Sequence, residues 1–119
     1  MIKRKIMREE LRLLKAASNS YRLRILGLLR ERPLCVCEIR EILGLAVSTV
    51  SSHLAILRAA GLITDFKDGK WVNYCRNEDE TSVRVRAMFN MVDTYAHRLV
   101  VVNHVGHECV PFRWPHVTR

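Results

Sequence analysis

The sequence of 119 residues has no long hydrophobic run. Its first stretch, MIKRKIMREELRLLK, is charged throughout, and the longest apolar run near the C-terminus covers only residues 99–102. A helix that crosses a bilayer needs about 20 apolar residues, and a secretory signal needs a continuous apolar segment of about 7–15. We therefore expect a cytoplasmic protein without a membrane partner.

The chain also lacks the patterns that mark common enzyme sites. It has no Cys-x-x-Cys pair, no glycine-rich cofactor loop and no evident base beside a nucleophile. A small thiol enzyme such as a reductase is therefore disfavoured, and we expect a binding protein rather than an enzyme.

Acidic residues are scarce at the start of the chain. Residues 1–32 carry ten Lys or Arg against three Glu, and the formal net charge of the whole chain is +8. This balance favours a polyanionic partner, with nucleic acid ahead of a membrane surface. The four cysteines of a cytosolic protein favour metal or redox chemistry over structural disulfides.

Hydrophobic periodicity predicts a series of helices in the first half of the chain. The first covers residues 3–17, and the second follows the N-cap candidates in ASNS and ends at Pro33. A third short helix covers 35–43 and a fourth covers 47–60, with Gly44 between them. This short turn between two helices is typical of a helix-turn-helix.

The fourth helix has one apolar and one polar face. Val50, Leu54 and Leu57 recur at helical spacing, so they are expected to face the core. The opposite face is small and polar, which would let the helix sit deep in a groove of DNA. The residues predicted to make groove contacts are Ser48, Thr49, Ser51, Ser52 and His53.

The segment LITDFKDGKWVNYC predicts a β-hairpin with its turn at Asp68-Gly69. Lys67 and Lys70 flank the tip, and we expect them to contact DNA phosphates, with Arg22 as a further backbone contact. Residues 80–104 then predict a last long helix.

The order of elements predicts a mainly α fold with a β-hairpin wing, a winged helix-turn-helix with an added helix at each end. We expect a single domain over 1–119 with its core at 18–77. The helices at 3–17 and 80–104 are expected to serve dimerisation, and the tail at 105–119 is expected to be irregular.

The motifs SNSYRLRILGLL, LCVCEI, LGLAVSTVSSHLAILRAAGLI and DGKWVNY resemble the ArsR/SmtB family of metal-sensing bacterial repressors. CVC followed by an acidic residue is similar to the motif of the arsenic-responsive members. The resemblance implies a homodimer that binds double-stranded operator DNA without a cofactor and leaves it when a metal or metalloid ion binds. Arg40 stands where those members carry a third cysteine, Ala46 replaces the usual Ser cap of the recognition helix, and Ser52 replaces the usual Arg before the His.

Cys35 and Cys37 are the predicted metalloid ligands. Residues two apart lie on nearly opposite sides of a regular helix, so both sulfurs can bind one ion only if the first turn is distorted. The helix N-terminus, with Arg32 and Arg40 nearby, is expected to favour thiolates. Because As(III) and Sb(III) are thiophilic, we expect one of them to be the inducer. Gathering the sulfurs would pull on the helix that supports the recognition helix.

The sequence does not decide which residue is the third metalloid ligand or whether there is a second metal site. Cys109 is the favoured third sulfur, ahead of Cys75 or an exogenous thiol. Asp93, His104 and His107 match part of the zinc pattern of the family. Because Met91 replaces one expected ligand, surface or structural histidines are favoured over a zinc site.

Two other sensing functions remain as alternatives to metalloid sensing. One is a redox or reactive-sulfur sensor in which Cys35 or Cys37 joins Cys109 in a disulfide. The other is a cadmium, lead or zinc sensor of the same family. A constitutive architectural DNA-binding protein is a third possibility.

Overall fold

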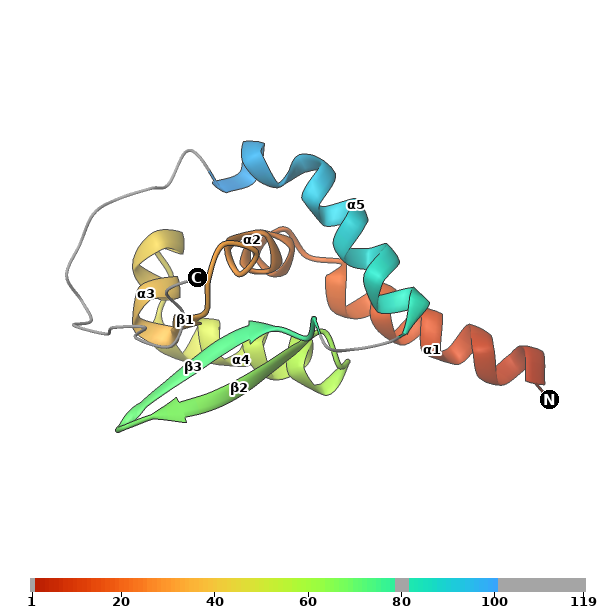
Figure 1. Cartoon of the computed structure of the whole chain (residues 1–119), viewed down its shortest axis with the longest axis horizontal. Coiled ribbons are helices and arrows are strands. Elements are labelled where there is room, and N and C mark those ends of the chain that lie inside the picture. Colours follow the sequence, from red (N-terminus) through yellow and green to blue (C-terminus); the bar gives the residue numbers. More distant parts are fainter. Residues whose placement is uncertain (1, 79–81, 101–119) are drawn as a thin grey trace.

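The computed structural model describes residues 2–78 and 82–100, with side chains described for 7–78 and 82–94. Within these residues, the fold consists of five helices and a small antiparallel sheet whose β2–β3 hairpin lies along one edge (Figure 1). The predicted mainly helical fold with a β-hairpin wing is confirmed. The elements are α1 (Ile2–Ala17), α2 (Ser20–Leu28), β1 (Leu34–Cys35), α3 (Val36–Leu43), α4 (Val47–Ala59), β2 (Ile63–Asp68), β3 (Trp71–Arg76) and α5 (Val83–Val100).

Helix α2 lies at the centre of the fold, between α5 and the layer made by α4 and the hairpin (Figure 1). Its N-cap is Asn19, whose side-chain oxygen accepts hydrogen bonds from the backbone N–H groups of Tyr21 and Arg22 at 2.8 and 3.1 Å. Ile25 and Leu26 of this helix are fully buried and form the middle of the hydrophobic core.

The helix-turn-helix consists of α3, a short turn and α4. Gly44 ends α3 in the left-handed conformation, with φ at 71°, and its N–H donates to the carbonyl of Arg40. Ala46 is the N-cap of α4 and provides no side-chain hydrogen bond, as its sequence position predicted. No single helix in the described ranges is long and apolar enough to cross a bilayer, and the one pair that passes together, α3 with α4, is bent by 112°.

The sheet has the strand order β1-β3-β2 and is antiparallel throughout. The hairpin turn is formed by Gly69 and Lys70, one position later than predicted, and Gly69 has the positive φ of 67° that such two-residue turns need. The short strand β1 was not predicted. It pairs Cys35 with Asn73, so Cys35 belongs to the wing sheet rather than to a helix.

Candidate functional site

Cys35 lies at a junction between the wing sheet and the helix-turn-helix. It is the last residue of β1 and the N-cap of α3, with extended backbone angles, and it is only 2% exposed. Its backbone N–H donates to Oε1 of Glu38 at 3.1 Å, and its side chain accepts from the backbone N–H of Glu38. A change at this sulfur therefore affects the sheet and the first turn of α3 together.

Burial raises the pKa of the Cys35 thiol above its ordinary value of 9.0. Hydrogen bonds from the backbone N–H groups of Glu38 and Cys37 oppose this rise, but the negative charge of Glu38 adds to it. The expectation of a thiolate favoured by the helix N-terminus and two arginines is wrong for Cys35. One of those arginines, Arg32, is paired with Glu38, with Nη1 and Oε2 3.2 Å apart.

The other described cysteines differ in their state. Cys37 is half-buried in the first turn of α3 and is disulfide-bonded, whereas Cys35 and Cys75 are free thiols. Cys75 lies on β3, where its Sγ is 3.4 Å from Oγ1 of Thr64 on the neighbouring strand. Across the described ranges no group of three or more His, Cys, Asp or Glu is placed to hold a metal ion. Cys109, the favoured third ligand, lies outside the described residues.

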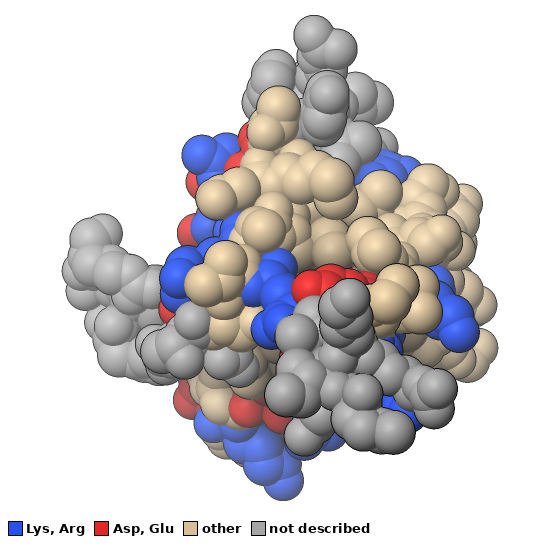
Figure 2. Space-filling model, turned by 90° about the vertical axis from the view of Figure 1, so that its right-hand side faces the viewer, with Lys and Arg blue, Asp and Glu red and all other residues tan. Residues whose placement is uncertain are grey.

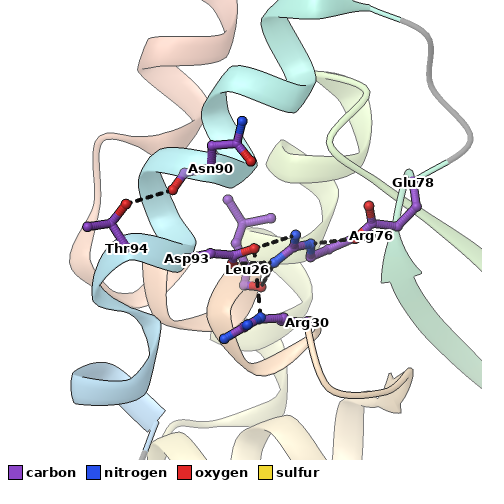
Figure 3. A network of polar contacts seen from close by, with 7 residues as sticks. All are labelled: Leu26, Arg30, Arg76, Glu78, Asn90, Asp93 and Thr94. Carbon is purple, nitrogen blue, oxygen red and sulfur yellow. Dashed lines mark hydrogen bonds and ion pairs between the residues drawn. The ribbon is translucent and has the colours of Figure 1, made fainter.

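Asp93, a predicted zinc ligand, is held by arginine (Figure 3). Its two carboxylate oxygens accept hydrogen bonds from Arg76 at 2.8 and 3.0 Å, and Nε of Arg30 lies 3.8 Å away. A metal at Asp93 would have to displace Arg76, whose side chain is only 5% exposed. The predicted partners His104 and His107 lie outside the described residues.

Arg76 is a structural residue that the sequence analysis missed. Besides Asp93 on α5, its guanidinium donates to the carbonyl of Leu26 on α2 at 3.3 Å and to Glu78 at 3.0 Å. Its guanidinium carbon also lies 4.2 Å from the ring centroid of Phe89. One buried cation thus ties the wing strand β3 to α2 and α5.

The recognition helix α4 presents the face that its periodicity predicts. Val50, Leu54 and Leu57 are buried. On the opposite side, the hydroxyl residues Ser48, Thr49, Ser51 and Ser52 are exposed. These short hydroxyl side chains leave room for the helix to approach a DNA groove closely, as proposed from the sequence.

His53 is half-buried on one flank of α4 and contacts two residues of α2. Its ring stacks on Tyr21, with the centroids 5.9 Å apart, and its Nδ1 lies 3.2 Å from Nη1 of Arg22. Burial lowers the pKa of His53 below 6.5, and the charge of Arg22 lowers it further. Both effects favour the neutral form of the His53 ring.

Arg22, predicted as a DNA-backbone contact, is half-buried between the end of α1 and α4. Its Nε donates to the carbonyl of Ala16 at 2.5 Å, and its Nη2 donates to the carbonyl of Lys15 at 3.3 Å. These carbonyls belong to the last turn of α1, where helical partners are missing. Because its Nη1 also contacts His53, Arg22 joins the end of α1 to the recognition helix.

The wing carries the predicted positive charge at its tip. Lys67 on β2 and Lys70 in the turn are both exposed. The base of the hairpin is fixed to α4 by an ion pair between Arg58 and Asp65, with 3.4 Å between Nη2 and Oδ1. This ion pair fixes the hairpin, and with it the tip lysines, relative to the recognition helix.

The terminal helices leave apolar side chains uncovered. Leu14 of α1 and Met91 of α5 are about half exposed and together line two adjoining hollows of about 380 and 360 Å³. The other large exposed apolar residues of these helices are Met7, Leu11 and Val83. Seen from the side on which α1 begins, residues other than Lys, Arg, Asp and Glu cover a broad area of the upper and right part of this face (Figure 2).

Residues 19–65 match the family model described as "Bacterial regulatory protein, arsR family". Over 65 residues the chain is 43% identical to the arsenical resistance operon repressor of Escherichia coli, an alignment covering 54% of this chain and 56% of that protein. It is also 43% identical over 61 residues to the cadmium resistance regulatory protein CadC of Listeria innocua, covering 50% and 51%. The chain thus spans about half the length of these two curated relatives.

Solved structures extend the similarity over more of the chain. Reduced HlyU from Vibrio cholerae is 36% identical, with a TM-score of 0.65, and the match covers 82% of this chain and 94% of that one. A homodimeric winged helix-turn-helix DNA-binding domain, Mb0332 from Mycobacterium bovis, is 28% identical with a TM-score of 0.67, covering 88% and 94%. These relatives are regulators by name, in agreement with the expectation of a binding protein rather than an enzyme.

Proposed function

The chain belongs to the arsR family of bacterial regulatory proteins, and on that premise we propose that it is a homodimeric repressor that As(III) or Sb(III) releases from operator DNA. Cys35 and Cys37 bind the metalloid in this proposal. The observation that carries it is the position of Cys35, which both ends a strand of the wing sheet and caps the helix that supports the recognition helix.

DNA binding in this proposal uses a dimer and needs no cofactor. The half-exposed apolar side chains of α1 and α5, including Leu14 and Met91, support an interface between two copies because burying them removes apolar surface from water. Each copy then offers one α4 to the major groove and one wing to the adjoining backbone. The tip lysines Lys67 and Lys70 supply phosphate contacts, which makes operator affinity depend on salt.

Metalloid binding does not require a preformed thiolate at Cys35. When a thiol condenses with arsenite, an As–S bond forms, an As–O bond breaks, and the thiol proton leaves with the hydroxide as water. The raised pKa of Cys35 lowers the fraction of thiolate and so slows formation of the As–S bond without preventing it. The disulfide of Cys37 must first be reduced, by two molecules of a cellular thiol that leave as their own disulfide, before its sulfur can bind.

Release follows from the strain that binding places on the first turn of α3. Cys35 is buried at the end of β1, and Cys37 is half-buried in the first turn of α3, so binding of one ion by both sulfurs is proposed to open that turn. Opening breaks the reciprocal hydrogen bonds with Glu38 and moves α3 against α4. The coupling is reciprocal, so operator DNA should weaken arsenite binding by the same factor.

The test uses an operator selected from random duplex DNA by the reduced protein. Fluorescence anisotropy then follows release as arsenite, antimonite, cadmium, lead or zinc is added. Cys35→Ser and Cys37→Ser should bind the operator but resist release by arsenite, while Cys75→Ser, a free cysteine of the wing, should behave as wild type. Arsenite release from the double variant would overturn the cysteine assignment, and release by cadmium alone would make cadmium the inducer. Cys109→Ser tests the third ligand.

Redox sensing is a second candidate because Cys37 is disulfide-bonded. With hydrogen peroxide as oxidant, two thiols give one disulfide and two waters. The sequence predicted Cys109 as the partner of Cys35 or Cys37. Mass spectrometry after mild oxidation identifies the bond, and anisotropy compares the oxidised and reduced proteins on the same operator. An affinity that changes with peroxide but not with arsenite would favour this candidate over metalloid sensing.

A further inference from the structure

The contact between Arg22 and His53 fixes the chemical form of a side chain on the recognition helix. A guanidinium has only N–H donors, so the Nδ1 atom of His53 must be the acceptor in their 3.2 Å contact. A neutral imidazole with a bare Nδ1 carries its hydrogen on Nε2. The ring is therefore held as a single tautomer, with its remaining donor at Nε2.

Two features keep Arg22 and the ring in this arrangement. The other nitrogens of Arg22 donate to the carbonyls of Lys15 and Ala16, so the guanidinium cannot turn away without breaking both hydrogen bonds. Tyr21 stacks on the imidazole with an angle of 29° between the rings. Both Arg22 and Tyr21 belong to α2, and this helix is packed in the core.

Within residues 7–78 and 82–94, the hydrogen bond of the His53 ring is the one through Nδ1, and the Nε2–H group has no partner there. His53 follows the exposed Ser51 and Ser52 and lies one helical turn after the exposed Thr49. A donor on that flank of α4 would meet the acceptor atoms of DNA when the helix enters the groove.

We propose that Arg22 is a positioning residue that holds His53 as its Nε2–H tautomer, so that the ring donates a hydrogen bond to an acceptor atom of the operator. The acceptor is a phosphate oxygen or a purine ring nitrogen. This inference rests on the proposed operator binding. It gives Arg22 a role in DNA recognition without any direct contact with DNA.

The first test compares two variants of His53 in the reduced protein with the selected operator at fixed salt. The amide of Gln reaches the position of Nε2 and can donate there, whereas the shorter Asn reaches only the position of Nδ1. We expect His53→Gln to stay within about threefold of wild-type affinity and His53→Asn to lose about tenfold. Equal affinities for the two variants would overturn the proposal.

The second test reads the tautomer directly. Nitrogen-15 NMR of the imidazole in the free protein should show the hydrogen on Nε2 in wild type and a mixture of tautomers in Arg22→Met. Arg12→Met, which removes an exposed arginine of α1, should leave the tautomer unchanged. A wild-type ring with its hydrogen on Nδ1 contradicts the inference. Failure of wild type to bind any selected duplex would instead refute the proposed function, because the tautomer is measured without DNA.

The third test separates a positioning role from a purely structural one and identifies the acceptor. In a His53→Gln background, where no tautomer needs fixing, Arg22→Met should cost much less affinity than in wild type. An equal cost in both backgrounds would mean that Arg22 acts through the fold alone. Methylphosphonate substitution finds a phosphate acceptor and 7-deazapurine substitution finds a purine nitrogen. If neither substitution reduces the difference between wild type and His53→Asn, no such hydrogen bond exists.

Discussion

Replacing Asp93 by Ala tests the account of the buried ion pair. The substitution removes both carboxylate oxygens that bind Arg76 at 2.8 and 3.0 Å. The guanidinium would then keep only the Leu26 carbonyl, the exposed carboxylate of Glu78 and the face of the Phe89 ring. A buried charge would have lost its main counterion.

The expected cost follows from the burial of the two partners. Breaking a fully buried pair from one side costs about 3–5 kcal/mol. The side chain of Arg76 is 5% exposed but that of Asp93 is 24% exposed, and Glu78 still neutralises part of the charge of Arg76. We therefore expect Asp93→Ala to lower the free energy of unfolding by about 2–3 kcal/mol. For a chain of this length that loss lowers the melting temperature by about 10 °C.

Urea unfolding at one fixed protein concentration measures this cost, because a dimer's stability depends on concentration. The matched control is Asp65→Ala, which breaks the pair with Arg58, a side chain that is 61% exposed, and should cost less than about 1 kcal/mol. The double variant Arg76→Met/Asp93→Leu should recover most of the lost stability. If Asp93→Ala lowers the free energy of unfolding by no more than the control does, the stabilising role of the Arg76–Asp93 pair is refuted. If zinc stabilises the wild type but not Asp93→Ala, the zinc site is supported again.

Three further predictions concern single features of the fold. Ala46→Ser should raise the free energy of unfolding by about 1 kcal/mol in urea titrations, because the N-cap of α4 is extended and has no side-chain hydrogen bond; no gain would mean that the hydroxyl does not reach the helix. Iodoacetamide should alkylate Cys35 slowly in the folded protein until the pH rises above 9, because burial raises the pKa of its thiol. In urea, where the thiol is exposed, alkylation should be fast. The contribution of this thiol to the free energy of unfolding is complete below pH 9 and falls above it. Removing Lys67 and Lys70 should flatten the plot of log affinity against log salt by about 0.9 for each lost phosphate contact, and an unchanged slope would exclude them from the DNA interface.

The helix-turn-helix could be predicted because its signals are local. The apolar spacing of Val50, Leu54 and Leu57 fixes which face of α4 is buried, and Gly44 supplies the left-handed cap that ends α3. The hairpin followed from the glycine at its turn. The strand at Leu34–Cys35 has only two residues, too few for any alternation to be detected, and it forms because β3 lies beside it.

The properties of the site residues were less predictable because they depend on tertiary contacts. Position at a helix N-terminus favours a thiolate, but burial in the core outweighs it at Cys35. Arg22 and Arg76 look like ordinary surface or DNA-binding charges in the sequence. Their partners lie up to 50 residues away along the chain, as with the carbonyl of Leu26, so only the folded structure brings them together.

The most direct test of the proposed function is a crystal structure of the reduced protein with As(III), in which the anomalous signal locates arsenic. We expect arsenic bonded to Sγ of both Cys35 and Cys37, with the first turn of α3 opened and the hydrogen bonds to Glu38 broken. Arsenic bound elsewhere, with both sulfurs free, in a preparation that no longer binds the operator, would contradict it.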